Sequence, residues 1–208
     1  PDGRPFAKCM TCGSPEGIYK AIEEKTGMHF AGREMKNTEP TETDKEAKKT
    51  AVNAIYPAPI EWRPVQMNGQ APTRHWEYTD STGKLLFVVA RWDTFQGKVI
   101  RPFSVVNANG NLIWKSVLQL EQRPPYNLKQ LTDNPKLPVL VVEGEKAAEA
   151  ARYIPEFAEH VVTTYQSGAK SWRRTDWQAL KGRDIVLWPD NDQEGLRNFI
   201  ELGQWFNT

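Results

Sequence analysis

The sequence predicts an α/β fold, with a doubly wound parallel sheet in the last third of the chain and a small β-rich unit before it. In residues 137–208, apolar strand-like runs alternate with helical segments, which is typical of a parallel sheet covered by helices on both faces. In residues 74–136, short aromatic and β-branched runs are separated by turn signals, which indicates an antiparallel sheet.

Composition and charge place the chain among ordinary globular proteins. Hydrophobic residues make up 39% and charged residues 25%, and the formal net charge is +1. A nucleic-acid partner would therefore have to be met by a local basic patch. No apolar run approaches the roughly 20 residues of a membrane span, and no signal sequence is visible, so we expect an intracellular protein. Because the chain starts at Pro1 and stops at Thr208 inside a predicted helix, we expect a fragment.

The first element along the chain, residues 1–31, contains a Cys-x-x-Cys-Gly pattern at Cys9 and Cys12. These are the only two cysteines, too few for a disulfide framework. The pattern is half of a zinc ribbon, because a structural zinc ion needs four ligands, so zinc is expected only in a longer protein. Two reduced surface thiols are the alternative.

The next element, residues 32–73, is predicted to be a linker. It opens with "GREMKNTEPTETDKEAKKTAVN", a mixture of Glu, Lys and Thr that has almost no large apolar residues. Such a segment cannot bury enough surface to offset its ordering entropy, so a solvated helix is the alternative to a linker.

The β-rich unit, residues 74–136, contains four strand-like runs. These are "HWEYTD", "KLLFVVARW", "KVIRPFSVV" and "NLIWKSVL", and "STG", "FQG" and "NANG" lie between them. The pattern predicts an antiparallel meander.

The last unit, residues 137–208, alternates strand and helix throughout. In order it reads "LPVLVV" (strand), "EKAAEAARYI" (helix), "HVVTTY" (strand), "SWRRTDWQALKG" (helix), "DIVLW" (strand) and "EGLRNFIELGQWF" (helix). Ligands of such sheets bind beyond the carboxyl ends of the strands, so the residues that follow each strand are the candidates for function.

Acidic residues follow two of these strands. "PVLVV" ends at Glu143, and "DIVLW" leads into Asp190 and Asp192. In extended chain, residues i and i+2 project to one side with their Cα atoms roughly 7 Å apart. Two such carboxylates repel unless a cation lies between them, and Mg²⁺ prefers carboxylate oxygens, so the pattern predicts a metal site. Alternatively, "DND" is a turn that caps the helix beginning near Gln193.

The loop "QSGAKSWRR" after the second strand contains Lys170 beside small residues, at the start of a predicted helix. A small-residue turn with adjoining cations suits a phosphate group. For Arg173 and Arg174, a solvated helix face is the favoured interpretation.

In order and spacing, "VLVVEGEKAAEAA", "SGAKSW" and "DIVLWPDNDQEG" resemble the TOPRIM domain of bacterial-type primases, topoisomerases and some nucleases. More narrowly, "VEGEK" together with "PDND" and Gly195 resembles the TOPRIM primases of bacteriophages, plasmids and related mobile elements, which are often joined to a helicase. The resemblance covers residues 137–208 and implies a Rossmann-like TOPRIM domain that is incomplete at its C-terminal end. This chain departs from many relatives at Ala147, where they have an acid.

The resemblance implies a DNA primase, a nucleotidyltransferase that makes short RNA primers for DNA replication in the cytoplasm of a bacterial host cell. The implied partners are a single-stranded DNA template, ribonucleoside triphosphates and a replicative helicase, fused or separate. Glu143 would be a general acid/base or metal-site residue, and Asp190 and Asp192 would hold Mg²⁺ or Mn²⁺. The stretch around Cys9 and Cys12 looks like the second half of the zinc-binding module at the start of bacterial-type primases.

The β-rich unit also resembles the segment that precedes TOPRIM in these primases, through "YTDSTGKLLFVVARWD", "GKVIRPF" and "PPYNLKQL". This implies that Arg91, Lys98 and Arg101 contact the template or the incoming nucleotide. Exposed charges on the polar face of a sheet are the alternative. Trp92 or Trp114 could stack on a base, with a place in the core as the alternative.

Three other functions remain open at this point. In a TOPRIM nuclease, the same acids would cleave phosphodiesters. In a non-catalytic module, the fold would only bind DNA or partner proteins. A glycosyltransferase-like Asp-x-Asp site is a weaker alternative, because it does not explain the acid after "PVLVV".

Overall fold

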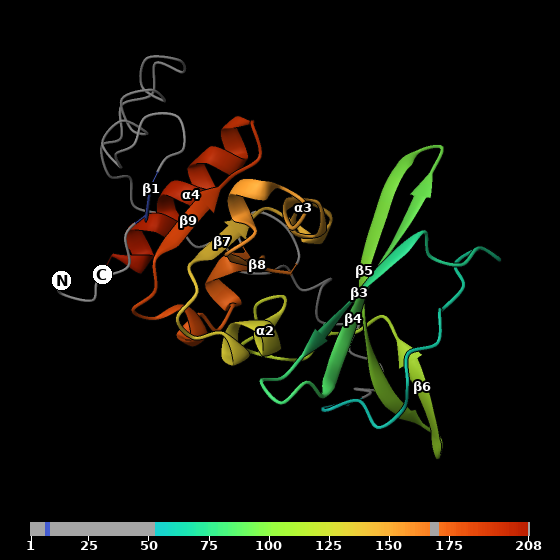
Figure 1. Ribbon diagram of the computed structural model, residues 1–208. Coiled ribbons are helices and arrows are strands. Elements are labelled where there is room, and N and C mark those ends of the chain that lie inside the picture. The colour runs from blue at the N-terminus through green and yellow to red at the C-terminus, as the bar shows by residue number, and fades with distance from the viewer. Residues whose placement is uncertain (1–6, 9–52, 167–170, 208) are drawn as a thin grey trace, which may run out of the picture.

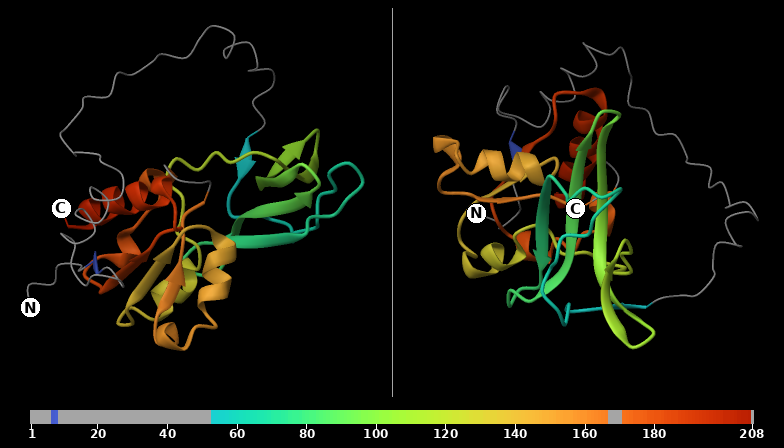
Figure 2. Two further views of the ribbon diagram at one scale, coloured as in Figure 1. Left: turned by 90° about the horizontal axis from the view of Figure 1, so that it is seen from above. Right: turned by 90° about the vertical axis from the view of Figure 1, so that its right-hand side faces the viewer.

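The computed structural model describes residues 7–8, 53–166 and 171–207, and these residues form two β-sheets side by side (Figure 1). Within them, one sheet is antiparallel with five strands, and the other is a small parallel sheet with helices packed around it. The left view of Figure 2 shows the same pair of sheets from above. The mixed α/β architecture predicted from the alternating patterns is therefore confirmed.

The strands are β1 (Ala7–Lys8), β2 (Ala54–Ile55), β3 (Arg74–Thr79), β4 (Leu85–Thr94), β5 (Gly97–Ala108), β6 (Asn111–Lys115), β7 (Val139–Val142), β8 (Val161–Thr163) and β9 (Ile185–Trp188). The α-helices are α2 (Leu128–Asp133), α3 (Glu145–Ala151) and α4 (Gln193–Phe206). Short 3₁₀ turns are η2 (Pro155–Phe157), η3 (Ser171–Arg174) and η4 (Gln178–Leu180).

The antiparallel sheet is the predicted meander. Its strands run in the order β2-β5-β4-β3, and β6 pairs with β5. The hairpin from β5 to β6 turns at Asn109 and Gly110, both of which have positive φ (53° and 86°). An Asn-Gly pair supplies this left-handed conformation at low cost, and its twist matches that of the flanking strands.

The antiparallel sheet begins earlier in the chain than residue 74. Ala54 and Ile55 pair with β5, and the half-buried Trp62 packs against Ala90, Trp92 and Phe103. Residues 53–73, the later part of the predicted linker, therefore contribute a strand and an apolar cover to this sheet.

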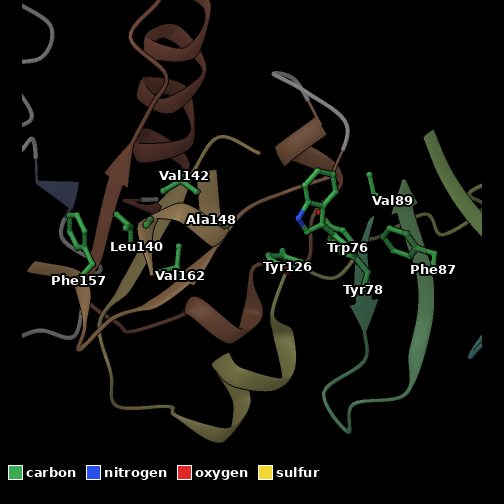
Figure 3. Packing of buried hydrophobic residues seen from close by; sticks show 11 residues of the cluster. Trp76, Tyr78, Phe87, Val89, Tyr126, Leu140, Val142, Ala148, Phe157 and Val162 are labelled. Carbon is green, nitrogen blue, oxygen red and sulfur yellow. The ribbon is translucent and has the colours of Figure 1, made fainter. Parts of the chain in front are cut away.

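The two faces of the antiparallel sheet bury different sets of residues. On one face, Trp76, Tyr78, Phe87 and Val89 join a core with residues of the parallel sheet (Figure 3). On the other face, the Trp92 side chain is 2% exposed, and its indole N–H donates to the Gln70 carbonyl at 3.0 Å. Trp92 is therefore a core residue and has no free ring face for a base.

The parallel sheet is covered by helices on both faces. Its order is β1-β9-β7-β8, with β7 paired in parallel to β8 and β9. Along β7, Leu140 and Val142 pack with the α3 residue Ala148, whereas Val139 and Val141 pack with α4. Because both faces are buried, the strand is apolar throughout rather than alternating.

The predicted helix "SWRRTDWQALKG" is wrong, because residues 171–180 form the two 3₁₀ turns η3 and η4. Between them, Thr175 pairs with Arg123 in an isolated parallel bridge. The Trp177 indole N–H also donates to the Trp172 carbonyl at 2.9 Å, and both rings are buried. These tertiary contacts hold the backbone out of a continuous helix.

Candidate active site at the carboxyl edge of the parallel sheet

Glu143 and Asp190 line the same cleft, which has a volume of about 480 Å³. They reach it from neighbouring parallel strands, since Val142 on β7 is paired in register with Trp188 on β9. The chain turns sharply after Glu143 because Gly144 adopts a φ of 87°, a conformation that favours glycine. The two acids that the sequence places 47 residues apart therefore meet at one edge of the sheet.

The first turn of α4 packs directly on these acids. A Cβ atom on Gly195 would lie 2.7 Å from Glu143 Oε2 and 2.9 Å from the Asp190 carbonyl oxygen. Only a glycine allows this approach without a shift of either acid. Gly195 therefore helps to set the position of the Glu143 carboxylate.

Asp192 has a different environment from Glu143 and Asp190. It is the N-cap of α4, and its Oδ1 accepts a hydrogen bond from the Gly195 N–H at 2.7 Å. Asp192 is thus a helix cap, as the alternative interpretation of "DND" predicted, and one of its carboxylate oxygens accepts a hydrogen bond from the helix backbone.

The described residues contain no group of three or more His, Cys, Asp or Glu side chains arranged to hold a metal ion. Mg²⁺ commonly binds through one or two carboxylates and completes its shell with water and substrate phosphates. Glu143 and Asp190 fit that mode, with Asp192 close by as the helix cap. Cys9 and Cys12, the predicted half of a zinc site, lie outside the described residues, as does Lys170.

The electrostatics of the cleft disfavour further negative charge. Burial, followed by the Asp190 carboxylate, raises the pKa of Glu143, although a hydrogen bond from the Asp190 backbone works in the opposite direction. Burial and the same two acids also raise the pKa of Tyr165. Within the described residues, Glu143 Oε2 and the Tyr165 hydroxyl are buried without a hydrogen-bond partner. A cation bound at Glu143 and Asp190 would relieve this repulsion and pair the unsatisfied oxygen.

The wall opposite the acids comes from the antiparallel sheet. Arg91, Lys98 and Ile100 line the cleft, and Arg91 forms an ion pair with Asp93 at 2.6 Å. Arg101 pairs across the strands with Ala90, whose side chain belongs to the core on the other face. Of the three predicted basic residues, Arg91 and Lys98 therefore reach the cleft, and Arg101 points to the opposite face.

Sequence reasoning assigned no role to Glu145, which also lines the cleft. Its side chain is buried, and Glu145 Oε1 accepts a hydrogen bond from the Tyr78 hydroxyl at 2.8 Å. This contact joins α3 to β3 and helps to hold the two walls together. The sequence offered only a weak signal, an acid two residues after Glu143, because burial by a distant strand leaves no local pattern.

The Gly195→Ala variant is expected to be about 1–3 kcal/mol less stable than the wild type, because its Cβ would clash with Glu143 Oε2 and with the Asp190 carbonyl oxygen. Alanine otherwise favours a helix by about 1 kcal/mol, so any loss of stability must come from the clash. Thermal unfolding of Gly195→Ala with and without Glu143→Asp provides the control. The shorter acid should restore the part of the stability that is lost to the contact with Glu143 Oε2, whereas the contact with the Asp190 carbonyl oxygen remains. Fully additive effects of the two changes would contradict a clash with Glu143.

The Glu145→Gln variant is expected to be more stable than the wild type at pH 8, with a smaller difference at pH 5. Burial raises the pKa of Glu145 above its ordinary value of 4.5, so the folded state binds the proton more tightly than the unfolded state does. Stability from this group is present at low pH and is lost as pH rises through the folded pKa. Gln keeps an acceptor for Tyr78 and carries no charge. Urea unfolding at both pH values checks this, and a Gln variant less stable at pH 8 would contradict it.

Comparison with protein-family models, with curated proteins and with solved structures found no match for this chain. A function has to be inferred from the cleft and from the motifs that line it. In the described part of the chain, none of the helices is long and apolar enough to cross a membrane.

Proposed function

We propose that the chain is the catalytic part of a TOPRIM-type DNA primase, which joins ribonucleotides into short RNA primers on a single-stranded DNA template. The observation that carries the proposal is the cleft in which Glu143 and Asp190 meet, with Lys98 and Arg91 on the opposite wall. The acids follow adjacent parallel strands, as the two TOPRIM-like motifs require. The basic wall comes from the unit that resembles the segment before TOPRIM.

Each group in the cleft has a role in this reaction. Glu143 and Asp190 would hold Mg²⁺ or Mn²⁺, which stabilises charge on the transferring phosphate and lowers the pKa of an attacking hydroxyl. Asp192 caps α4 and so fixes the glycine that packs on Glu143. Lys98 and Arg91 lie where the phosphates of a nucleotide or template would be attracted.

A direct assay tests the proposal. The protein is incubated with a single-stranded DNA template, ribonucleoside triphosphates and Mg²⁺, and the products are separated by size. We expect short RNA primers that depend on the template and the metal. Degradation of the template without primers would contradict the proposal and would indicate a nuclease, whereas binding without either product would indicate a non-catalytic module. A helicase partner and a zinc site at Cys9 and Cys12 stay predictions.

The Lys98→Ala variant is expected to bind single-stranded DNA about 3- to 10-fold more weakly. The dependence of its affinity on salt concentration should correspond to about one fewer counterion released on binding. Lys98 lines the cleft, whereas Arg101 on the same strand points to the other face, so Arg101→Ala is the matched control. Fluorescence anisotropy at several salt concentrations measures both variants. Equal losses for the two would show that the cleft face has no special role in binding.

A further inference from the structure

The cleft that Glu143 and Asp190 line is called the acidic cleft below. A second pocket, of about 250 Å³, opens beside it, and we call this pocket the Trp188 pocket. Its lining includes Val142, Ala147, Ala150, Ile154, Trp188 and Asp190. Ala147, Ala150 and Asp190 also line the acidic cleft, so the two hollows adjoin each other.

The Trp188 pocket exists because small side chains of α3 lie opposite a large ring. Trp188 is the last residue of β9, two positions before Asp190. Its ring packs against the buried Phe157, with centroids 5.3 Å apart, and yet it remains 42% exposed. A partly exposed aromatic ring, in contact with a buried one, therefore borders the open space next to the acids.

The chemistry of the two hollows defines the ligand that would fill both. One end of that ligand must interact with a cation held by carboxylates and with basic side chains, and the other must be flat and apolar. The Trp188 pocket is smaller than the roughly 300–1,000 Å³ of a complete small-molecule site, so it suits a single ring system. The rest of the ligand would occupy the larger cleft.

We infer that the Trp188 pocket holds the base of the incoming ribonucleoside triphosphate, whose triphosphate lies in the acidic cleft. This inference rests on the primase proposal and assigns it a nucleotide subsite. Trp188 supplies the stacking surface, and the alanines of α3 leave room for the ring. Stacking of a base on an aromatic side chain makes a substantial contribution to binding affinity, and this contribution does not require a particular base.

The lining of the Trp188 pocket has a consequence for selectivity. Among the described residues that form it, the only side chains with a hydrogen-bonding group are those of Asp190 and of Trp188, whose indole N–H is a single donor. The side chains therefore provide almost no hydrogen bonds to the edge of a base, which is where bases differ. The four ribonucleotides should bind with similar affinity in the absence of template, and the template would make the choice.

The test compares two probes, ATP and inorganic tripolyphosphate, by equilibrium titration with Mg²⁺ present. We expect Trp188→Ala to weaken ATP binding by about tenfold and to leave tripolyphosphate binding unchanged. Ile154→Phe, at a half-buried position that lines the Trp188 pocket and not the acidic cleft, should weaken ATP binding in the same way by filling the space. Tyr153→Ala is the matched control, because it removes an aromatic ring that is 88% exposed and outside the pocket.

Several outcomes would overturn the inference. Unchanged ATP binding in both variants would show that the base lies elsewhere, and equal losses for ATP and tripolyphosphate would indicate general damage to the cleft. A loss of affinity for a short oligothymidylate but not for ATP would assign the pocket to a nucleic-acid strand. In each of these cases, primer synthesis by the wild type would leave the primase proposal standing. A wild type that neither binds ATP nor makes primers would refute both.

Discussion

Replacing Glu143 with Gln is expected to lower the rate of primer synthesis by about 10²- to 10⁴-fold while the fold is retained. The substitution keeps the shape of the side chain and removes the charge that would hold a divalent cation beside Asp190. It also removes a buried carboxylate whose pKa is raised by burial and by Asp190, so stability at neutral pH should not fall. Single-turnover primer synthesis and thermal unfolding measure the two effects.

The control for Glu143→Gln is Glu156→Gln, at an exposed position on η2. This variant should keep wild-type activity. Mg²⁺ should raise the unfolding temperature of the wild type and of the control, and should have a smaller effect on Glu143→Gln, because only a ligand that binds the folded state stabilises it. Activity of Glu143→Gln within threefold of the wild type would exclude a catalytic role for this residue.

Replacing Arg183 with Met is expected to lower the free energy of unfolding by about 3 kcal/mol. Arg183 is 7% exposed, and its guanidinium donates to the carbonyl oxygens of Leu131, Asn134 and Leu137. These carbonyls lie at or just beyond the end of α2, where a helix leaves acceptors without partners. Met fills a similar volume and leaves those acceptors unsatisfied in a buried site. Urea unfolding measures the difference.

The matched control for Arg183→Met is Lys129→Met, on the exposed side of α2. Lys129 forms an (i, i+4) ion pair with Asp133 at 2.6 Å, and exposed pairs of this kind contribute about 0.3–0.5 kcal/mol. A loss below about 1 kcal/mol for Arg183→Met would show that water replaces the guanidinium at these carbonyls.

The predicted strands survive in the structure because their signals are local. The apolar run before Glu143 is buried on both faces, and so is the middle of β4, whose residues divide between two cores. Turn residues such as Asn109 and Gly110 adopt the positive φ that their chemistry permits. Hydrophobic period and turn chemistry act over a few residues, so they can be recognised without knowledge of the fold.

Predictions failed or stayed open where contacts with residues distant in the sequence determine the conformation of the backbone or the burial of a side chain. The stretch after residue 170 was predicted to be a helix from its place between two strands, but the bridge to Arg123 and the burial of Trp172 and Trp177 leave it as 3₁₀ turns. Glu145, to which the sequence analysis assigned no role, is a buried acceptor for Tyr78, which lies 67 residues away in the sequence. Such contacts depend on how two sheets pack and have no local signal.

The candidate site divides in the same way. The order of strands and helices places Glu143 and Asp190 at the same edge of the sheet, because parallel strands carry their carboxyl ends to one edge. That β7 and β9 lie side by side, although β8 comes between them in the sequence, was decided by the tertiary structure. The tertiary structure decided that Asp192 caps α4, that Lys98 faces the acids and Arg101 does not, and that an apolar pocket lies beside them. The succession of parallel strands and helices depends on local patterns along the chain, whereas the order of strands within the sheet and the facing of side chains across a cleft depend on how distant segments pack.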